Sequence, residues 1–341
     1  MSDRRALSLS TDGLATSLRC PRRYEFAHVH ELDDGEDDPP EERRLDLCRQ
    51  AICDTLRTGH TDADALETAA LERFATLWGD RDERYHSFAQ RRHERRVLEA
   101  TIRAYVEAFG AEHASGLAEL QAASESAGEL IGPELPLSSA VQLPDRETTV
   151  EVDAAVDYVV ASGSSLTGVR FVPTLTPLGL LRYRDEWEGA VADLFDDHFD
   201  PDEETFEPGP AGALLETAVV LDGLRELRDR LGLGDRQCRY LLVPLADQSN
   251  TTVNWIRESV ETSLDSLDLT DVFLDHHTFG MTLEHRNATV EGRLAAVVGR
   301  IVDKQFDPGR QWEQISAHSC ENCAYTVCCQ EYVSSEVAFD E

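Results

Sequence analysis

The chain has 341 residues and a formal net charge of -34 at pH 7. Hydrophobic residues make up 41% of it, which is ordinary for a globular protein and excludes wholesale disorder. No apolar run approaches the roughly 20 residues that a membrane helix needs, and the N-terminus lacks the apolar segment of a secretory signal. The sequence therefore predicts a soluble, cytoplasmic protein with no membrane partner.

The acidic residues are spread along the whole length, and Lys304 is the only lysine among 32 Lys+Arg. An acidic surface with almost no lysine is typical of halophilic proteins. These proteins work in a cytoplasm that balances molar external salt with internal KCl. Dense carboxylates keep such a surface hydrated, and ions screen their repulsion over about 3 Å at 1 M salt. We therefore attribute the negative charge to adaptation to a high-salt solvent. The charge then gives little information about binding partners.

The predicted elements begin with a strand-like start and a capped helix over residues 7–27. A charged linker with paired prolines follows at 31–42. From about 43 to 127 the apolar spacing is helical, with breaks near Gly59 and Gly79. This part of the sequence predicts a bundle of several helices.

Residues 141–175 alternate apolar and polar side chains around two turn signals, which predicts an antiparallel strand meander. The later elements are an acidic loop, a helix, a buried strand, two further helices and an extended run into the cysteines: 196–210, 214–233, 239–245, 254–267, 288–304 and 306–312. Helix, meander, helix and strand indicate an α/β core with helical additions.

Eight cysteines in an intracellular chain favour metal or redox chemistry over disulfides. The informative spacing is Cys320-x2-Cys323-x5-Cys329, because a C-x2-C pair places two thiolates at one turn within reach of one ion. Cys328 lies next to Cys329 and leaves the register of the third ligand open, and we favour Cys329. A fourth ligand must come from elsewhere in the chain.

Cys20 is the best candidate for that ligand, because Arg19, Arg22 and Arg23 flank it and nearby guanidinium groups favour the thiolate. Four thiolates suit tetrahedral zinc and a [4Fe–4S] cluster equally well. The plain alternative is a set of free cysteines. A shared metal centre would tie the two ends of the chain together.

Cys20 within LRCPRRYEF, followed about 300 residues later by FDPGRQW and HSCENCAYTVCCQEY, resembles the RecB-like nucleases of the PD-(D/E)XK superfamily. The chain is most similar to their iron–sulfur subset, which contains AddB and the CRISPR-associated RecB-like exonucleases. In that subset one cysteine before the nuclease core and a C-x2-C-x5-C group after it ligate a [4Fe–4S] cluster. The order of elements between the end motifs agrees over nearly the whole chain.

This resemblance implies an α/β fold with a restriction-endonuclease-like core, in which helices flank a small mixed sheet. A helical insertion and a four-cysteine cluster that joins the N- and C-terminal segments would complete a single RecB-like nuclease-type domain over 1–341. Its parts would be an N-terminal cluster segment, the helical insertion, the α/β core, and C-terminal helices with the cysteine cluster: 1–30, 43–127, 131–250 and 251–341.

The resemblance also implies a catalytic centre of carboxylates that hold Mg²⁺ or Mn²⁺, together with a lysine that helps to activate water. Asp157 occupies the place of the family's strand aspartate. Arg170 and Val172 stand at the expected positions of the second acid and the lysine, and no carboxylate or lysine lies between Thr167 and Thr176. Most of the catalytic set is therefore missing.

Two more positions of the family motif differ here. Cys53 stands where an early helical histidine would end, and Glu216 stands near the usual glutamine. Period-2 alternation also places Glu151, Asp153 and Asp157 on one strand face, which makes them a candidate Mg²⁺ site. The alternative for Glu151 and Asp153 is a solvated strand face in an acid-rich protein.

Arginines concentrate in two places that could bind nucleic acid with neighbouring aromatic rings. They lie beside Cys20 and in the RRHERR segment of the long predicted helix: Arg19, Arg22, Arg23, Arg91, Arg92, Arg95 and Arg96. The alternative for RRHERR is a solvated helix face with i,i+4 ion pairs. High salt weakens purely electrostatic binding, with a slope of about 0.9 per phosphate charge neutralised.

We interpret the sequence as a RecB-like protein of the DNA repair or recombination type with little or no catalysis. It would bind DNA, as single strands or ends, or scaffold a partner such as a helicase. Two alternatives stay open, namely an active Mg²⁺-dependent DNA exonuclease with migrated residues and an iron–sulfur redox or sensing module. A carboxylate and Lys304 beside Asp157 would favour the nuclease, whereas Arg170 in that space would favour the non-catalytic protein.

Overall fold

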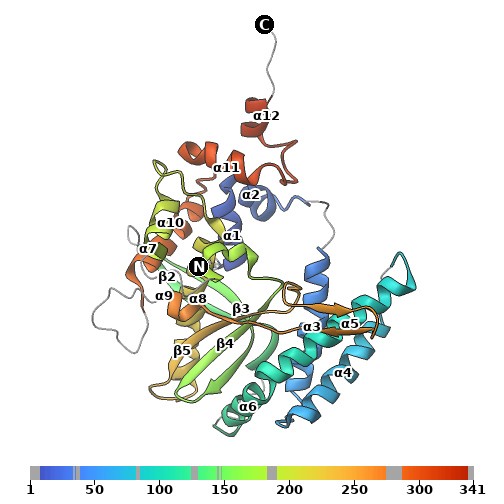
Figure 1. Ribbon diagram of the computed structural model, residues 1–341. Coiled ribbons are helices and arrows are strands. Elements are labelled where there is room, and N and C mark those ends of the chain that lie inside the picture. Colours follow the sequence, from blue (N-terminus) through green and yellow to red (C-terminus); the bar gives the residue numbers. More distant parts are fainter. Residues whose placement is uncertain are drawn as a thin grey trace.

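The computed structural model describes these residues: 8–33, 35, 39–81, 85–123, 130–143, 146, 148–182, 190–273 and 286–336. It has a mixed β-sheet with helices on both faces, which confirms the predicted α/β class (Figure 1). No helix within the described residues has the length and apolar character of a membrane span.

The predicted meander forms the centre of the sheet, as β2 (Ile131–Leu143), β3 (Thr148–Ser162) and β4 (Ser165–Val172). The three strands pair antiparallel in chain order. Gly163 has φ +54° in the β3–β4 turn, a conformation that glycine adopts without steric cost. Alternating β-branched residues, such as those of VEVDAAVDYVV, suit strands buried between two layers.

Three further strands extend the sheet. β5 (Gln237–Pro244) runs parallel to β4, and β8 (Leu267–Asp268) pairs antiparallel with β5. β1 (Ser8–Ser10) lies parallel to the first part of β3. A parallel neighbour requires a crossover, and α8 (Pro208–Arg230) lies between β4 and β5 in the chain and packs on the sheet.

One face of the sheet packs against α8, α1 (Thr11–Arg19) and α10 (Ala288–Val302) around a large apolar core. Gly223 permits the close approach of α8 to β2, because a Cβ there would lie 2.8 Å from the Cβ of Leu137. Short elements border this layer: η4 (Thr176–Arg182), α7 (Ala190–Phe199) and α9 (Leu269–Phe273).

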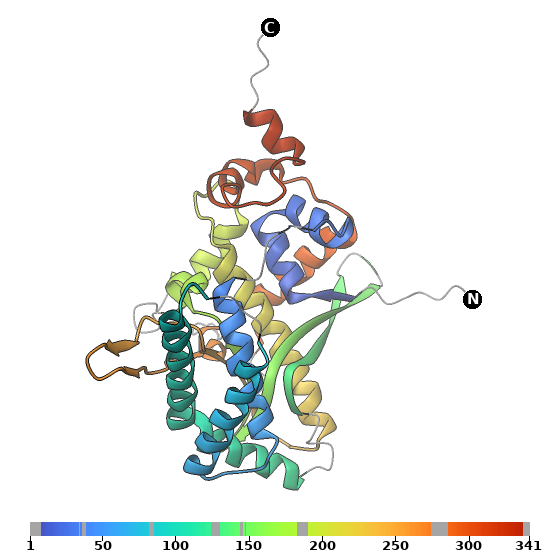
Figure 2. The same ribbon diagram turned by 90° about the vertical axis from the view of Figure 1, so that its right-hand side faces the viewer.

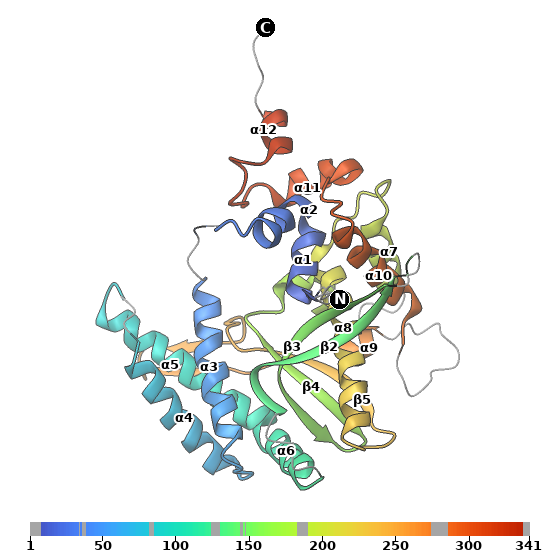
Figure 3. The ribbon, with the colours of Figure 1, turned by 180° about the vertical axis from the view of Figure 1, so that it is seen from behind.

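The other face carries the predicted helical region as α3 (Pro40–Leu56), α4 (Ala63–Gly79), α5 (Phe88–Tyr105) and α6 (Ala111–Ala123), with the π-helical η2 (Val106–Gly110) between the last two. The breaks after α3 and α4 fall at the predicted glycines. Figures 1 and 3 show α3, α4 and α5 as one helical layer beside the sheet. A second apolar core lies between this layer and the sheet.

The two ends of the chain lie side by side. α2 (Pro21–Tyr24) and the π-helical η1 (Glu25–Val29) are next to α11 (Trp312–Ser319) and below α12 (Gln330–Glu336) (Figures 1 and 2). Cys20, Ile315 and Cys320 form a small buried cluster between them.

Three predicted elements were wrong. In place of a helix over 254–267 there is a hairpin of β6 (Thr252–Asn254) and β7 (Ser259–Glu261). The side chain of Asn254 accepts hydrogen bonds from the amides of Ile256 and Arg257, and this local turn competes with a helix.

The other two errors concern element boundaries. The predicted loop 196–210 is shorter, because α7 runs to Phe199 and α8 begins at Pro208, where proline suits the first helical turn. The predicted extended run 306–312 contains a 3₁₀ turn, η6 (Gly309–Gln311), that leads into α11.

Candidate functional site

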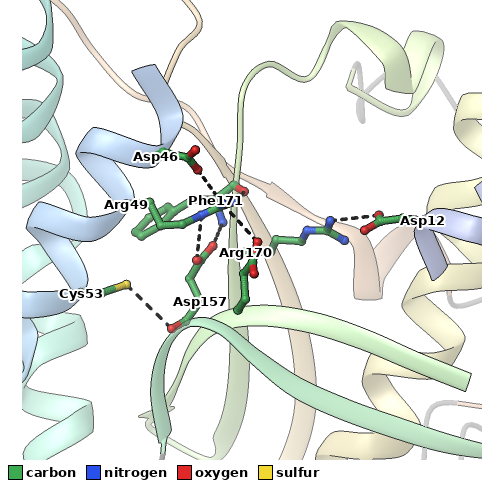
Figure 4. Close-up of polar contacts among 8 residues, drawn as sticks. Asp12, Asp46, Arg49, Cys53, Asp157, Arg170 and Phe171 are labelled. Atoms are coloured by element: carbon green, nitrogen blue, oxygen red, sulfur yellow. Dashed lines mark hydrogen bonds and ion pairs between the residues drawn. The ribbon is translucent and has the colours of Figure 1, made fainter. Parts of the chain in front are cut away.

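Asp157 lies in the middle of β3 and is 2% exposed. Its Oδ2 accepts a hydrogen bond of 2.6 Å from the amide of Phe171 on β4, and its Oδ1 lies 3.0 Å from Nε of Arg49 on α3 (Figure 4). The contact with Arg49 is an ion pair without hydrogen-bond alignment. The acid that the sequence singled out is therefore buried and already paired.

Arg49 holds several groups of this site together. Its Nη2 donates to the carbonyl of Phe171 at 3.2 Å, and its Nη1 lies 3.1 Å from a carboxylate oxygen of Asp46. Cys53, one turn later on α3, has its Sγ 3.9 Å from the carbonyl oxygen of Asp157. Figure 4 shows both side chains pointing from α3 toward β3.

Sequence reasoning missed Arg49, although it had placed Cys53 at the position of the family's early histidine. The i,i+4 spacing puts Arg49 on the same helix face as Cys53. A charged residue one turn before that position was the available signal.

The pKa of Asp157 is raised above its usual value, because burial penalises the carboxylate. Arg49 acts in the opposite direction and stabilises the charged form, as do the amide of Phe171 and the nearby Arg170. The positive charge that a divalent ion would supply beside Asp157 therefore comes from Arg49 and Arg170. Arginine side chains stay protonated, so this charge is permanent.

Arg170, at the expected position of the second acid, forms a half-buried ion pair with Glu216 on α8. Glu216 also accepts a hydrogen bond from the hydroxyl of Tyr240 on β5. A second carboxylate, that of Asp12 on α1, lies 3.3 Å from Nη2 of Arg170. The Arg170–Glu216 pair and its neighbours thus join four elements, β4, α8, β5 and α1.

The expected lysine position is apolar, since Val172 packs partly buried against the core. Lys304 follows α10 and lines a different pocket with Arg22, Glu25 and Phe306. It therefore does not take the place of the missing catalytic lysine beside Asp157.

The three acids of β3 proposed as a Mg²⁺ site do not come together. Asp153 accepts hydrogen bonds from the hydroxyls of Ser8 and of Ser138, the latter at 2.8 Å, and Glu151 is exposed. Along β3, every second residue up to Val156 packs into the core that contains α8. This alternation shifts by one residue after Val156, where the pairing of β2 with β3 is irregular. Among the described residues, no three His, Cys, Asp or Glu side chains are grouped closely enough to hold one metal ion.

The four predicted cysteine ligands line one pocket at the junction of the two chain ends. Cys20 comes from the α1–α2 junction, and Cys320, Cys323 and Cys329 come from the segment between α11 and α12. The amide of Cys323 donates to the carbonyl of Cys320 at 3.2 Å, so these two residues share one turn. The pocket thus brings together residues from opposite ends of the sequence.

Cys329 rather than Cys328 belongs to the pocket. Cys328 is exposed, and its Sγ lies 3.3 Å from the carbonyl oxygen of Tyr325. Cys329 is buried and lines the pocket with the other three cysteines.

Burial raises the pKa of the Cys20 thiol. The amides of Arg23 and Arg22 lower it by hydrogen bonding, so the predicted influence comes from their backbone and not from their guanidinium groups. Burial and the proximity of the other three cysteines raise the pKa of Cys320 to about 11. Burial and mutual proximity thus favour the protonated thiols of Cys20 and Cys320.

Other contacts also join the two ends of the chain. Arg22 pairs with Glu25 at 2.6 Å and with Glu331 of α12. The hydroxyl of Tyr325 donates to the carbonyl of Leu32 at 3.0 Å. Of the predicted nucleic-acid-binding arginines near Cys20, Arg22 is thus engaged within the protein, while Arg23 lines the cysteine pocket and Arg19 is exposed.

The RRHERR arginines lie on α5, away from those of α1 and α2 (Figure 1). Arg92 and Arg96 pair with Glu258 of the β6–β7 hairpin at 3.7 and 2.8 Å, whereas Arg95 pairs with Glu99 at 2.8 Å. Arg91 is exposed. The two predicted concentrations of arginine therefore lie in separate regions of the structure.

The hairpin adds an aromatic residue that sequence reasoning missed. Trp255, in the turn between β6 and β7, is 73% exposed, and its ring lies 5.1 Å from that of His93 on α5. Ile256 beside it is 95% exposed. Because the sequence predicts a helix over 254–267, it does not indicate that Trp255 and Ile256 are exposed in a turn.

A scan of the sequence against protein-family models finds no match, and a search of curated proteins finds no matching relative. Function therefore has to be inferred from the residues of the site.

Proposed function

We propose that this chain is a RecB-like nuclease-type protein that binds DNA or holds a repair partner with little or no catalysis. Its sheet and helices would form a restriction-endonuclease-like core. A four-cysteine centre, a [4Fe–4S] cluster in the related nucleases, would close its two ends. One observation carries the proposal, namely that arginine side chains neutralise the acids at the position of the family's metal site.

That observation concerns two arginines. Mg²⁺ binds carboxylate oxygens at about 2.0–2.1 Å and retains several waters. The Asp157 carboxylate is in contact with a guanidinium and an amide, and Arg170 is paired with Glu216. Metal binding would require both arginines to move and would leave buried charges unpaired, which costs several kcal/mol. This arrangement favours a protein that keeps the fold without hydrolysing phosphodiesters.

Four thiols lining one pocket are the donor set that a zinc or iron–sulfur centre takes, although in the described structure no three of them lie closely enough to form a metal-binding group. Cys20, Cys320, Cys323 and Cys329 would hold it, and it would compensate their charge and crosslink the ends of the chain. Zinc is the alternative to iron and sulfide, because both take four thiolates. Iron, sulfide and zinc analysis of protein purified without oxygen distinguishes these two assignments.

DNA binding is supported by the surface of α5 and the β6–β7 hairpin. Arg91 and Arg92 are exposed on α5, where Arg92 pairs with Glu258 of the hairpin and the ring of His93 lies against Trp255. Arginines can follow a phosphate backbone while an exposed indole stacks on an unpaired base, and stacking persists at salt concentrations that screen charge. Single-stranded DNA or strand ends are therefore the ligands that this surface fits best.

The test is a nuclease assay on end-labelled single-stranded DNA in molar KCl, with Mg²⁺ and with Mn²⁺. We expect no cleavage above the buffer background from wild type or from Asp157→Ala. Asp153→Ala serves as the matched control on the same strand. Cleavage by wild type that Asp157→Ala abolishes would overturn the proposal in favour of an active nuclease.

A binding assay must accompany this test. Fluorescence anisotropy with a labelled single strand measures whether DNA is held, and affinity capture from a cell extract finds a repair partner. Tight DNA binding without cleavage supports the proposal. Absence of both DNA binding and a repair partner, combined with a cluster that is reduced and reoxidised reversibly, would favour a redox module instead.

A further inference from the structure

A pocket of about 520 Å³ lies where the C-terminal end of α10 meets α2 and η1. Arg22 and Glu25 line it from the N-terminal segment, and residues between Arg300 and Gly309 line the rest. The volume lies within the range of about 300–1,000 Å³ typical of small-molecule sites. The pocket therefore has room for a ligand, outside the Asp157 site.

Five charged side chains line the pocket: Arg22, Glu25, Arg300, Lys304 and Asp307. Glu25 pairs with Arg22 at 2.6 Å, and Arg22 also pairs with Glu331 of α12, which does not line the pocket. The carboxylate of Asp307 accepts a hydrogen bond of 2.8 Å from the amide of Gly309. Neither Arg300 nor Lys304 has a side-chain hydrogen bond or an ion pair with any residue that the structure describes. These two cations therefore stay unpaired in a chain with 66 Asp+Glu and 32 Lys+Arg.

Lys304 has φ +56°, a left-handed conformation that a residue with a Cβ adopts at a steric cost. It ends α10, where its amide donates to the carbonyl of Ile301 at 3.0 Å and the amide of Gln305 donates to the carbonyl of Arg300 at 2.9 Å. Glycine is the usual residue at this position of a helix end. α8 ends with the same pair of hydrogen bonds, and there the position is taken by Gly232, with φ +67°. The only lysine of the chain thus replaces a glycine that would be less strained.

Backbone strain of this kind is concentrated at ligand-binding positions. A basic residue also complements the dipole at a helix C-terminus, but Arg300 in the last turn of α10 already does so from a helical conformation. Lys304 places a second positive charge four residues after it, and like charges at this spacing repel. A bound anion would offset that repulsion, so the two side chains favour an anionic ligand.

We propose that this pocket binds a phosphate group through Arg300 and Lys304. A guanidinium presents a planar fork of donors and an ammonium a compact charge, and both suit phosphate oxygens. The one aromatic lining residue, Phe306, is buried against Tyr24 at 5.8 Å between ring centroids, so the pocket offers no exposed ring to a base. The phosphate can come from two sources, the backbone of a nucleic-acid strand or a free phosphorylated small molecule. The inference goes beyond the proposed function, because it requires neither the α5–hairpin surface nor an inactive Asp157 site.

The experiment uses the fact that Lys304 is the only lysine. Full-length protein labelled with ¹³C at lysine Cε gives one lysine signal in a nuclear magnetic resonance spectrum. We titrate it at constant ionic strength in KCl with inorganic phosphate, with glucose 6-phosphate and with a single-stranded oligonucleotide, and we expect a saturable shift of that signal. Saturation at a lower concentration of oligonucleotide than of either small phosphate assigns the strand as the source, and the reverse order assigns a free phosphate. No saturable shift with any of the three probes would overturn the proposal.

Two variants test the two cations separately. Arg300→Gln should weaken binding of the best probe about fivefold to tenfold, because it removes a charge-assisted contact to phosphate. Arg293→Gln is the matched control on α10, since Arg293 pairs with Asp196 at 3.6 Å, and it should change affinity less than about twofold.

Lys304→Gly separates a ligand role from a structural one. Glycine adopts the left-handed conformation without steric cost, so this variant should unfold at a higher temperature than wild type. It should still bind the best probe about fivefold to tenfold more weakly in isothermal titration, since the ammonium group is lost. Wild-type affinity in Lys304→Gly, or equal losses in Arg300→Gln and Arg293→Gln, would overturn the proposal.

Discussion

Arg49 on α3 and Asp157 on β3 form a buried ion pair, with 3.0 Å between Nε and Oδ1. It links the helical layer to the sheet. Removing one partner of such a pair leaves an uncompensated buried charge, whereas replacing both partners can be neutral. This relationship explains how an acid without a catalytic partner set can still matter to the fold.

Arg49→Met should therefore lower the free energy of unfolding by about 3–5 kcal/mol. Loss of the guanidinium leaves the Asp157 carboxylate unpaired in a buried site. The double variant Arg49→Met with Asp157→Asn should recover most of that loss. Urea denaturation in KCl, followed by far-ultraviolet circular dichroism, measures each free energy.

Asp46→Asn is the control for Arg49, because Asp46 contacts the same guanidinium from an exposed position. It should cost at most about 1 kcal/mol. A double variant as unstable as Arg49→Met alone would show that the arginine stabilises the fold through packing and not through its charge.

His113 predicts a specific pH dependence of stability. Its Nδ1 lies 2.8 Å from the hydroxyl of Tyr158, and burial lowers its pKa from 6.5 to about 4. The folded state thus holds neutral His113 while the unfolded state takes up a proton. The stability from His113 is complete above pH 6.5 and decreases as pH falls toward 4.

At pH 5 this effect should cost about 2 kcal/mol relative to pH 7.5. Urea denaturation of wild type and of His113→Gln at both pH values measures it, and the variant should have the smaller difference. His60→Gln, at an exposed position, should behave like wild type. Equal pH dependence of wild type and His113→Gln would contradict the prediction.

Local patterns predicted most of the fold. Alternation along Val150 to Val160 with a glycine turn gave the meander, and the breaks near Gly59 and Gly79 gave the helices of the layer. The β6–β7 hairpin was missed because its apolar spacing resembled a helix. The competing hydrogen bonds from the side chain of Asn254 are formed only within the turn itself.

The sites were predictable to different degrees. Spacing grouped Cys320, Cys323 and Cys329, and the arginines beside Cys20 together with the family resemblance predicted that Cys20 would join them; all four line one pocket. The pairing of Arg49 with Asp157 depends on how α3 packs against the sheet. No spacing rule connects a helix face to a strand more than a hundred residues later, so only the tertiary structure could identify this partner.

The proposed four-cysteine centre predicts that Cys320→Ser loses bound metal and destabilises the protein. Crosslinking a loop of about 300 residues contributes roughly 5–6 kcal/mol on chain-entropy reasoning extrapolated from disulfides. Iron, sulfide and zinc content and the visible absorption spectrum follow the centre, and urea denaturation follows stability. Cys238→Ser, in a buried cysteine of another core, is a control that should keep the metal.

A further pair of variants fixes the register of the third ligand. Cys329→Ser should lose the metal, whereas Cys328→Ser should retain it, because Cys328 is exposed and does not line the pocket. The opposite result would assign Cys328 as the ligand.

Trp255→Ala should weaken binding of single-stranded DNA without unfolding the protein. The indole is 73% exposed beside His93, so its removal costs little core packing. Base stacking on an aromatic side chain contributes about 1–3 kcal/mol, which corresponds to a loss of affinity of roughly fivefold to more than a hundredfold. Fluorescence anisotropy with a labelled strand in molar KCl measures this change.

Trp255→Phe should retain part of the affinity, because a smaller ring still stacks on a base. Phe88→Ala is the control, since Phe88 is as exposed as Trp255 but lies at the start of α5, outside the hairpin. Stacking depends weakly on salt, so the ratio of wild-type to Trp255→Ala affinity should change little between low and high KCl. A ratio that disappears at high salt would show that Trp255 acts by positioning Arg92 and Arg96 and not by stacking.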